Sequence, residues 1–170
     1  MAGVVEEIGK SVTKFKVGDM VFGTTTMLKT GSYAEFICLP EKWESGVIDL
    51  KPQNLSFREA AALPVGAMTA IYLLEKANLK NGQTVLIYGA SGSVGSYAVQ
   101  IANQKGSRVT GVCSTSNFEM VRSLGAESLK DYKKEDYSKG NEKFDLIFDA
   151  VGKTTKSKAK KVLKTGGTFV

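Results

Sequence analysis

The chain has 170 residues, of which 42% are hydrophobic and 24% are charged. This composition is typical of a globular protein with one domain, or with one domain and part of a second. The sequence contains no histidine, which excludes histidine acid–base catalysis and most kinds of zinc site within these residues.

Apolar runs, cysteines and charge narrow the class of protein further. No uninterrupted apolar run approaches the roughly 20 residues of a membrane span, and no signal peptide is recognisable, so we expect no membrane partner. Cys38 and Cys113 are isolated in strand-like segments, which favours free thiols and a cytoplasmic location. Because Val162 and Leu163 give the lysine-rich segment an apolar side, a solvated helix face is favoured there over a nucleic-acid surface. Much of the net charge of +6 comes from that segment, through Lys153, Lys156, Lys158, Lys160, Lys161 and Lys164.

Residues 1–50 have the pattern of a small β domain. Strands are predicted at 3–5, at 15–23 around a Gly-Asp turn, and at 31–39, where apolar and polar residues partly alternate. From the residues alone, this region is a small antiparallel barrel or sandwich.

Two short helices are predicted next. Ser56 and Glu59 form a capping box, in which each side chain bonds the other residue's backbone amide, and a helix follows to Leu63. Pro64 interrupts it, because proline has no amide hydrogen to donate. A second helix is predicted from about residue 66 to residue 76.

The segment 84–105 contains the most informative motif. Residues 84–88 are an apolar, β-branched run, as expected for a strand buried on both faces of a parallel sheet. A glycine turn and a helical apolar pattern follow, which together are typical of a nucleotide-binding motif. Gly92 would let the backbone approach a pyrophosphate, and Gly95 would let the helix pack on the strand. A plain βα turn is the alternative, because Ala90 replaces the motif's first glycine. The predicted pyrophosphate site comprises Ala90, Ser91, Gly92, Ser93, Val94 and Gly95.

The remaining residues continue to alternate between strands and helices. Strands are predicted at 108–113, 128–132 and 144–150, with a fifth strand reaching Val170. Between the strands predicted at 108–113 and 128–132, a capping box at Ser116 and Glu119 starts a helix. A polar connection is predicted at 133–143, and the lysine-rich helix precedes the fifth strand.

This alternation predicts an α/β fold with a doubly wound parallel sheet. Ligands of such sheets bind at the carboxyl ends of the strands. Gly92 to Gly95, Ser114, Thr115 and Val151 should therefore surround one crevice. About 20 residues past the turn, where an acidic residue would select NAD, stand the small hydroxyl residues Ser114 and Thr115. These residues predict that NADP(H) binds more tightly than NAD(H). The expected difference in affinity is only about tenfold, because no lysine or arginine follows them.

The A-x-G-x-x-G turn after V-L-I-Y-G resembles the medium-chain dehydrogenase/reductase superfamily, and within it the zinc-independent quinone oxidoreductase (zeta-crystallin-like) branch. The phrases F-K-V-G-D-x-V and G-S-Y-A-E-F in the first 50 residues look like its GroES-like domain. The resemblance covers essentially the whole chain. It implies a partial GroES-like domain at 1–50 and a Rossmann NAD(P)-binding domain at 51–170. It also implies an internal fragment, which begins inside a barrel strand and lacks the last strands of the sheet.

The resemblance also assigns individual positions. Thr69 matches a threonine near the nicotinamide end of the cofactor, although a helix threonine bonded to its own backbone is the alternative. Tyr132 matches an aromatic residue beside the adenosine, or is an ordinary residue at the end of a strand. Val65 stands where zinc-dependent relatives have a cysteine ligand, so no zinc is expected.

The function that the resemblance implies is hydride transfer from NADPH to a quinone or an α,β-unsaturated carbonyl, by a parent enzyme that is a homodimer. The protein would mainly position the cofactor. No catalytic residue is assigned within these 170 residues, and the chain alone is expected to be inactive. The alternative is a nucleotide-binding fragment or regulatory relative without activity.

Overall fold

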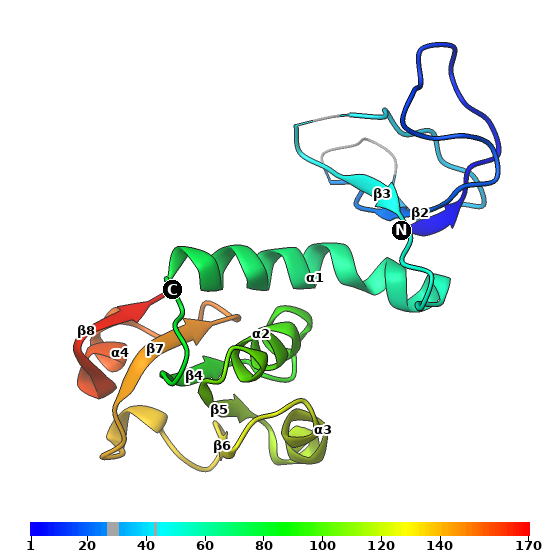
Figure 1. The fold of residues 1–170 in the computed structure, drawn as a ribbon. Coiled ribbons are helices and arrows are strands. Elements are labelled where there is room, and N and C mark those ends of the chain that lie inside the picture. Colours follow the sequence, from blue (N-terminus) through cyan, green and yellow to red (C-terminus); the bar gives the residue numbers. More distant parts are fainter. Residues whose placement is uncertain (27–30, 43) are drawn as a thin grey trace. The chain divides into compact units, whose positions relative to one another are not determined.

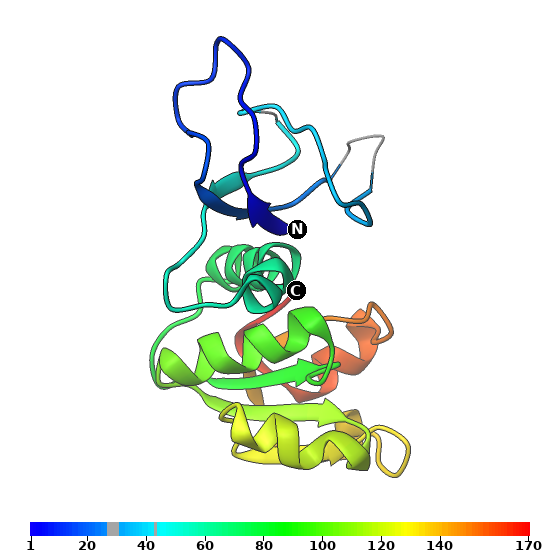
Figure 2. The same ribbon diagram turned by 90° about the vertical axis from the view of Figure 1, so that its right-hand side faces the viewer.

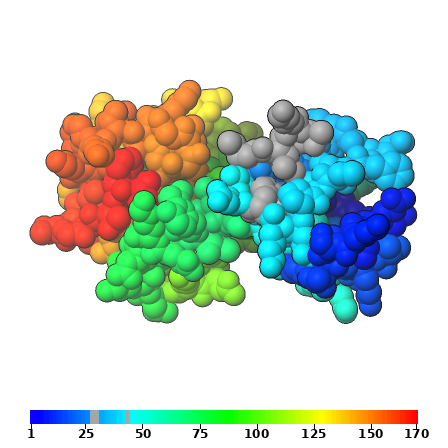
Figure 3. Space-filling view, turned by 90° about the horizontal axis from the view of Figure 1, so that it is seen from above, coloured from blue at the N-terminus to red at the C-terminus, as the bar shows by residue number. Residues whose placement is uncertain are grey.

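The computed structural model describes residues 1–26, 31–42 and 44–170. The chain forms two compact units, Met1–Val65 and Gly66–Val170. The first unit has the blue to cyan colours in Figure 3 and the second the green to red colours. The division falls inside a helix, and a domain boundary after residue 50 stays a prediction.

The first unit contains a three-stranded antiparallel sheet in the order β1-β2-β3. Its strands are β1 (Ala2–Val4), β2 (Met20–Gly23) and β3 (Ile48–Leu50). The turn before β2 forms at Gly18, whose φ is 91°. The strand predicted at 31–39 is wrong, because these residues form no strand. Tyr33 and Phe36 are exposed, so the alternating pattern has no buried face to support it. Residues 27–30 and 43, within the predicted β region, lie outside the described residues.

Helix α1 (Phe57–Lys76) is a single helix with Pro64 inside it, so the predicted interruption is wrong. Proline removes one backbone hydrogen bond, and burial of Ala60, Pro64 and Ala70 holds the helix together across it. The capping box at its start is confirmed: the Ser56 amide donates to Glu59 Oε2 at 2.8 Å. By length and composition alone α1 could cross a membrane, which is weak evidence because core helices of soluble proteins pass the same test.

The second unit is built on a five-stranded parallel sheet in the order β6-β5-β4-β7-β8. This order confirms the predicted doubly wound sheet, since the chain starts at the centre with β4, extends to one edge and returns to the other. The strands are β4 (Thr84–Tyr88), β5 (Arg108–Cys113), β6 (Ser128–Asp131), β7 (Phe144–Asp149) and β8 (Leu163–Phe169).

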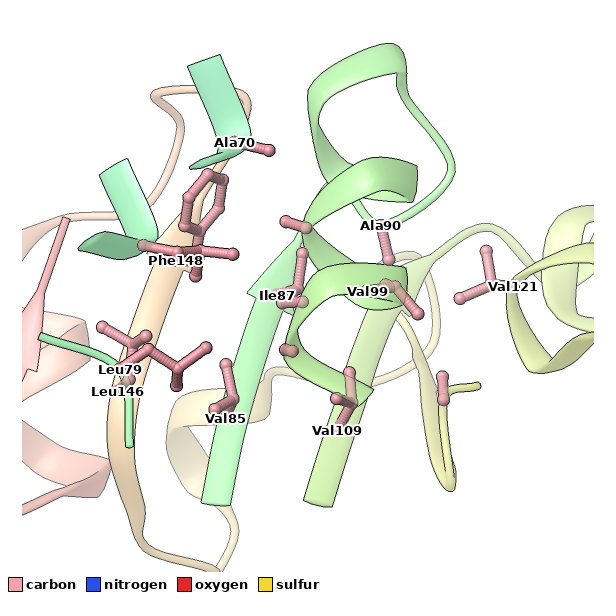
Figure 4. Packing of buried hydrophobic residues seen from close by; sticks show 14 of the residues in the cluster. Ala70, Leu79, Val85, Ile87, Ala90, Val99, Val109, Val121, Leu146 and Phe148 are labelled. Carbon is pink, nitrogen blue, oxygen red and sulfur yellow. The ribbon is translucent and has the colours of Figure 1, made fainter. Parts of the chain in front are cut away.

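Helices cover both faces of this sheet (Figure 1, Figure 2). On one face α2 (Ser93–Gln104) and α3 (Phe118–Ser123) pack through Val99 and Val121, together with the second half of α1 through Ala70. Figure 4 shows these side chains meeting those of the central strands. On the other face α4 (Lys156–Val162) packs through Ala159 and Val162. The lysines of α4 are exposed, as the predicted solvated face requires.

Two local predictions in this unit are wrong. The helix after β5 begins with a 3₁₀ turn, η1 (Thr115–Asn117), and Ser116 makes no capping bond, because its hydroxyl lies 3.1 Å from that of Ser114. The connection at 133–143 is not simply polar. It contains the 3₁₀ turn η2 (Tyr137–Lys139), which buries Tyr137 against the sheet.

Candidate functional site

The glycine turn follows the central strand β4. Gly89 has a φ of 80°, in the left-handed region, and a Cβ there would lie 2.3 Å from a methyl group of Val151. The amides of Gly89 and Ala90 donate to the carbonyl oxygen of Val112 at 2.9 and 3.0 Å. Gly89 therefore makes the sharp turn, one position before the place where the motif would have its first glycine. Ala90 occupies that place and is fully buried.

The start of α2 is open toward solvent. Gly92 is its N-cap residue, no side chain caps it, and the first turn has no acidic residue. Gly92 and Ser93 are both exposed. A Cβ on Gly95 would lie 2.1 Å from the carbonyl oxygen of Gly89, so only glycine lets α2 lie this close to the turn. The helix thus presents backbone N–H groups and the positive end of its dipole, an arrangement that suits a phosphate.

The second half of α1 lies against the start of α2. A Cβ on Gly66 would lie 2.4 Å from Ser93 Oγ and 2.9 Å from a ring carbon of Tyr97. Thr69 follows Gly66 by three residues, which places it on the same side of the helix, and it is half-buried. Thr69 therefore lies one helical turn beyond the residue of α1 that meets Ser93. Its role at the nicotinamide stays a prediction.

Ser114 and Thr115 follow β5 and differ in the partners of their hydroxyl groups. Thr115 donates its amide to Asp131 Oδ2 at 3.0 Å, and its hydroxyl to the same oxygen. The Ser114 hydroxyl accepts from the side-chain amide of Asn117 at 3.1 Å. Because the Thr115 hydrogen is used by Asp131, the expected donation to a phosphate falls to Ser114 alone.

Asp131 is a carboxylate at this site that the sequence analysis missed. It pairs with Cys113 in the register of β5 and β6, so the residues that follow, Ser114 and Tyr132, leave neighbouring strands side by side. The Thr115 hydroxyl, followed by the amide of Lys133 at 2.8 Å, lowers the pKa of Asp131. The carboxylate is therefore a fixed acceptor that joins two loops.

Asp149 organises the loop after β7 in a similar way. Its Oδ1 accepts the amides of Val151 and Gly152, both at 2.9 Å, and its Oδ2 accepts the amide of Thr154 at 2.8 Å. The loop is held beside the glycine turn, where Val151 contacts Gly89. The structure thus brings Val151 next to Gly89, and the crevice predicted around Gly92 to Gly95, Ser114 and Thr115 stays a prediction. Asp149 was also missed, although an Asp that ends a strand before small residues is a usual loop former.

The chemistry that this arrangement offers is binding and positioning. Among residues 1–26, 31–42 and 44–170, no three His, Cys, Asp or Glu side chains are grouped to hold a metal. Burial raises the pKa of the Cys113 thiol, which keeps it in the neutral form. The expectation of no zinc at Val65 or elsewhere stays a prediction.

Known proteins resemble this chain along its whole length. Residues 1–52 match the alcohol dehydrogenase GroES-like domain, and residues 93–170 match the zinc-binding dehydrogenase family. The chain is 40% identical to 2-methylene-furan-3-one reductase of Solanum lycopersicum, covering 100% of this chain and 44% of that protein. It is 36% identical to the chloroplastic NADPH-dependent alkenal/one oxidoreductase of Arabidopsis thaliana, covering 100% and 45%. The chain therefore spans less than half the length of these two relatives.

The solved structures agree with the sequence comparison. The quinone oxidoreductase from Coxiella burnetii matches with a TM-score of 0.86 and 32% identity, over 99% of this chain and 52% of that chain. It shares the order of a GroES-like region followed by a doubly wound sheet. Taken with the two family matches and the aligned relatives, this shows that the chain belongs to the medium-chain dehydrogenase/reductase superfamily and is similar to its quinone and enone oxidoreductases.

Proposed function

We propose that the chain is the nucleotide-binding part of an NAD(P)H-dependent oxidoreductase that reduces a quinone or an α,β-unsaturated carbonyl. The observation that carries the proposal is the uncapped start of α2 behind the Gly89 turn, at the centre of a doubly wound parallel sheet. The substrate class is supported by the names of similar proteins, which are a 2-methylene-furan-3-one reductase, an alkenal/one oxidoreductase and a quinone oxidoreductase.

In this proposal each part of the site binds one part of a nicotinamide dinucleotide. The pyrophosphate lies against Gly92 to Gly95, where a Cβ on Gly95 could not fit and the helix amides are open. Ser114 faces the adenosine ribose, and Thr69 lies toward the nicotinamide. The bound cofactor supplies the hydride, and the residues of this chain hold it in position.

The cofactor that we propose is NADP(H) in preference to NAD(H). Ser114 offers a hydroxyl to a 2′-phosphate, and none of Ser114 to Asn117 is acidic. Asp131 weakens the preference, because its carboxylate lies against Thr115 and carries negative charge. The net preference therefore stays small, about tenfold.

The alternative is a module that binds the nucleotide without turnover. One observation favours it: the carboxylates that end β6 and β7, Asp131 and Asp149, are both occupied by backbone amides. They hold loops and are poorly placed to exchange protons with a substrate.

Fluorescence titration with NADPH and NADH, followed by steady-state oxidation of NADPH, tests the proposal. The acceptors are 1,4-benzoquinone and methyl vinyl ketone. Binding of both nucleotides, with NADPH the tighter, is the expected result. Failure to bind either nucleotide would contradict the proposal. Binding without oxidation of NADPH is the result expected of this chain alone, and oxidation of NADPH with either acceptor would contradict the alternative.

A further inference from the structure

A pocket of about 280 Å³ opens at the carboxyl edge of the parallel sheet. Its walls come from Tyr88 at the end of β4, from residues 132–137 after β6, and from Lys153, Thr154 and Lys158 after β7. The rings of Tyr88 and Tyr137 pack together, with their centroids 5.7 Å apart. The pocket is separate from the glycine turn, since none of residues 89–95 lines it.

Four lysines and two carboxylates line this pocket, so its net formal charge is positive. The carboxylates are already paired with cations. Asp136 lies 3.4 Å from the ammonium of Lys158, and Glu135 lies 3.7 Å from that of Lys130. A ligand in the pocket therefore meets an excess of cationic groups.

Three of the four lysines keep their charge available. In the part of the chain that the structure describes, Lys133, Lys134 and Lys153 form no salt bridge. Lys133 lies over the ring of Tyr132, 5.9 Å from its centroid, and all three lysines are exposed. An anion placed between them would gain attraction at little desolvation cost to the lysines.

The pocket adjoins the position proposed for the adenosine ribose. Ser114 and Tyr132 follow paired positions of β5 and β6, and Tyr132 lines the pocket. Asp131 accepts the amides of both Thr115 and Lys133, which fixes the loop after β5 to the loop that carries the lysines. Lys133 and Lys134 thus lie on a loop that is bonded directly to the ribose position, and Lys153 lines the same pocket from the loop after β7.

We propose that Lys134 and Lys153, assisted by Lys133, bind the 2′-phosphate of NADP(H) and set the preference over NAD(H). This rests on the proposed function, that the chain binds a nicotinamide dinucleotide. The loop after β5 offers no cation, because Ser116 and Asn117 are neutral. The loops after β6 and β7 supply it instead, as point charges of the kind that lysine provides to phosphate.

The test compares two variants that lose the same charge. Lys134→Gln/Lys153→Gln removes the pocket cations, and Lys156→Gln/Lys160→Gln removes two exposed lysines of α4 that do not line the pocket. Dissociation constants for NADPH and NADH are measured by fluorescence, and those for 2′,5′-ADP and 5′-AMP by calorimetry. Thermal unfolding verifies that each variant is folded. If the pocket double variant does not fold, the single variant Lys134→Gln is measured in its place.

In the pocket variant we expect the preference for NADPH over NADH to fall about tenfold, with NADH binding changed less than about twofold. The preference for 2′,5′-ADP over 5′-AMP should fall in parallel, and the α4 variant should keep both preferences. If the wild type binds NADH and the pocket variant keeps both preferences, the subsite is wrong and the proposed function stands. Equal loss of NADPH and NADH binding would also overturn the subsite. A wild type that binds neither nucleotide overturns both proposals.

Discussion

Asp145 shows how one side chain joins three strands of the parallel sheet. Its Oδ2 accepts the amide of Thr84 at 2.8 Å, the hydroxyl of Thr84 at 2.7 Å and the ammonium of Lys164 at 2.7 Å. Burial alone would raise its pKa. The bonds from Lys164 and Thr84 outweigh burial and lower the pKa to about 2. The ionised form therefore ties β4, β7 and β8 together near their amino ends.

Asp145→Asn should lower the free energy of unfolding at pH 7 by about 1–2 kcal/mol. A folded-state pKa below the unfolded value stabilises the protein above about pH 4, and this stabilisation is lost as the pH falls toward 2. Urea unfolding at several pH values measures it. The difference from the wild type should shrink between pH 4 and pH 2. The exposed Glu127→Gln is the control, and a pH-independent difference for Asp145→Asn would refute the explanation.

Ser114→Asp should reverse the cofactor preference. A carboxylate at this position would repel a 2′-phosphate and accept hydrogen bonds from a free ribose. We expect NADPH binding to weaken at least tenfold while NADH binding stays equal or improves, as measured by fluorescence titration. Ser128→Asp is the control, because it adds the same charge at the start of β6, at the amino end of the strand. It should change the binding of neither NADPH nor NADH. An unchanged ratio in Ser114→Asp would show that Ser114 is not at the ribose.

At the scale of elements, the distance between α2 and β4 is set by two glycines. Gly89 makes the turn, and Gly95 lets the first turn of α2 lie on it, with room for a hydrogen only. The atom that a Cβ on Gly95 would meet is the backbone carbonyl oxygen of Gly89, which cannot rotate away as the end of a side chain can. Substitution at Gly95 must therefore move the helix or the turn.

Gly95→Ala should lower the free energy of unfolding by about 1–3 kcal/mol, the usual cost of overpacking, and weaken nucleotide binding. Chemical denaturation and NADPH titration measure the two effects. Gly140→Ala is the control, because its backbone φ of −78° suits any residue and its Cβ would lie 3.8 Å from the nearest atom, an ordinary contact. Two variants of equal stability would contradict the packing that we describe.

At the scale of the whole chain, we predict that the protein contains no zinc. It has no histidine, and its two cysteines are Cys38, which is exposed, and Cys113, which is buried in a strand of the other unit. Zinc needs three or four nitrogen, sulfur or carboxylate ligands on one centre. Elemental analysis after purification in metal-free buffer checks the prediction. Near-stoichiometric zinc would contradict it.

The sequence by itself determined the order of elements in the second unit. Residues 84–88 and 108–113 were predicted as strands with the bounds that the structure shows. The clearest signal is at 84–88, because buried parallel strands are near-continuous apolar runs. The glycine turn and the helix after it could also be predicted, because glycine spacing and helical periodicity are local patterns in the sequence. The parallel sheet and its ligand-binding edge then followed from the alternation of strands and helices.

Only the tertiary structure decided the features that depend on distant neighbours. The pattern at 31–39 lacks a buried face and forms no strand, whereas burial keeps α1 continuous through Pro64. Asp131 and the pocket lysines have no local pattern that marks them. They meet because the register of β5 and β6 and the return of the chain to β7 bring separate loops to one edge of the sheet. The electrostatics of the candidate site are thus a property of the fold, because they arise from charges far apart in sequence.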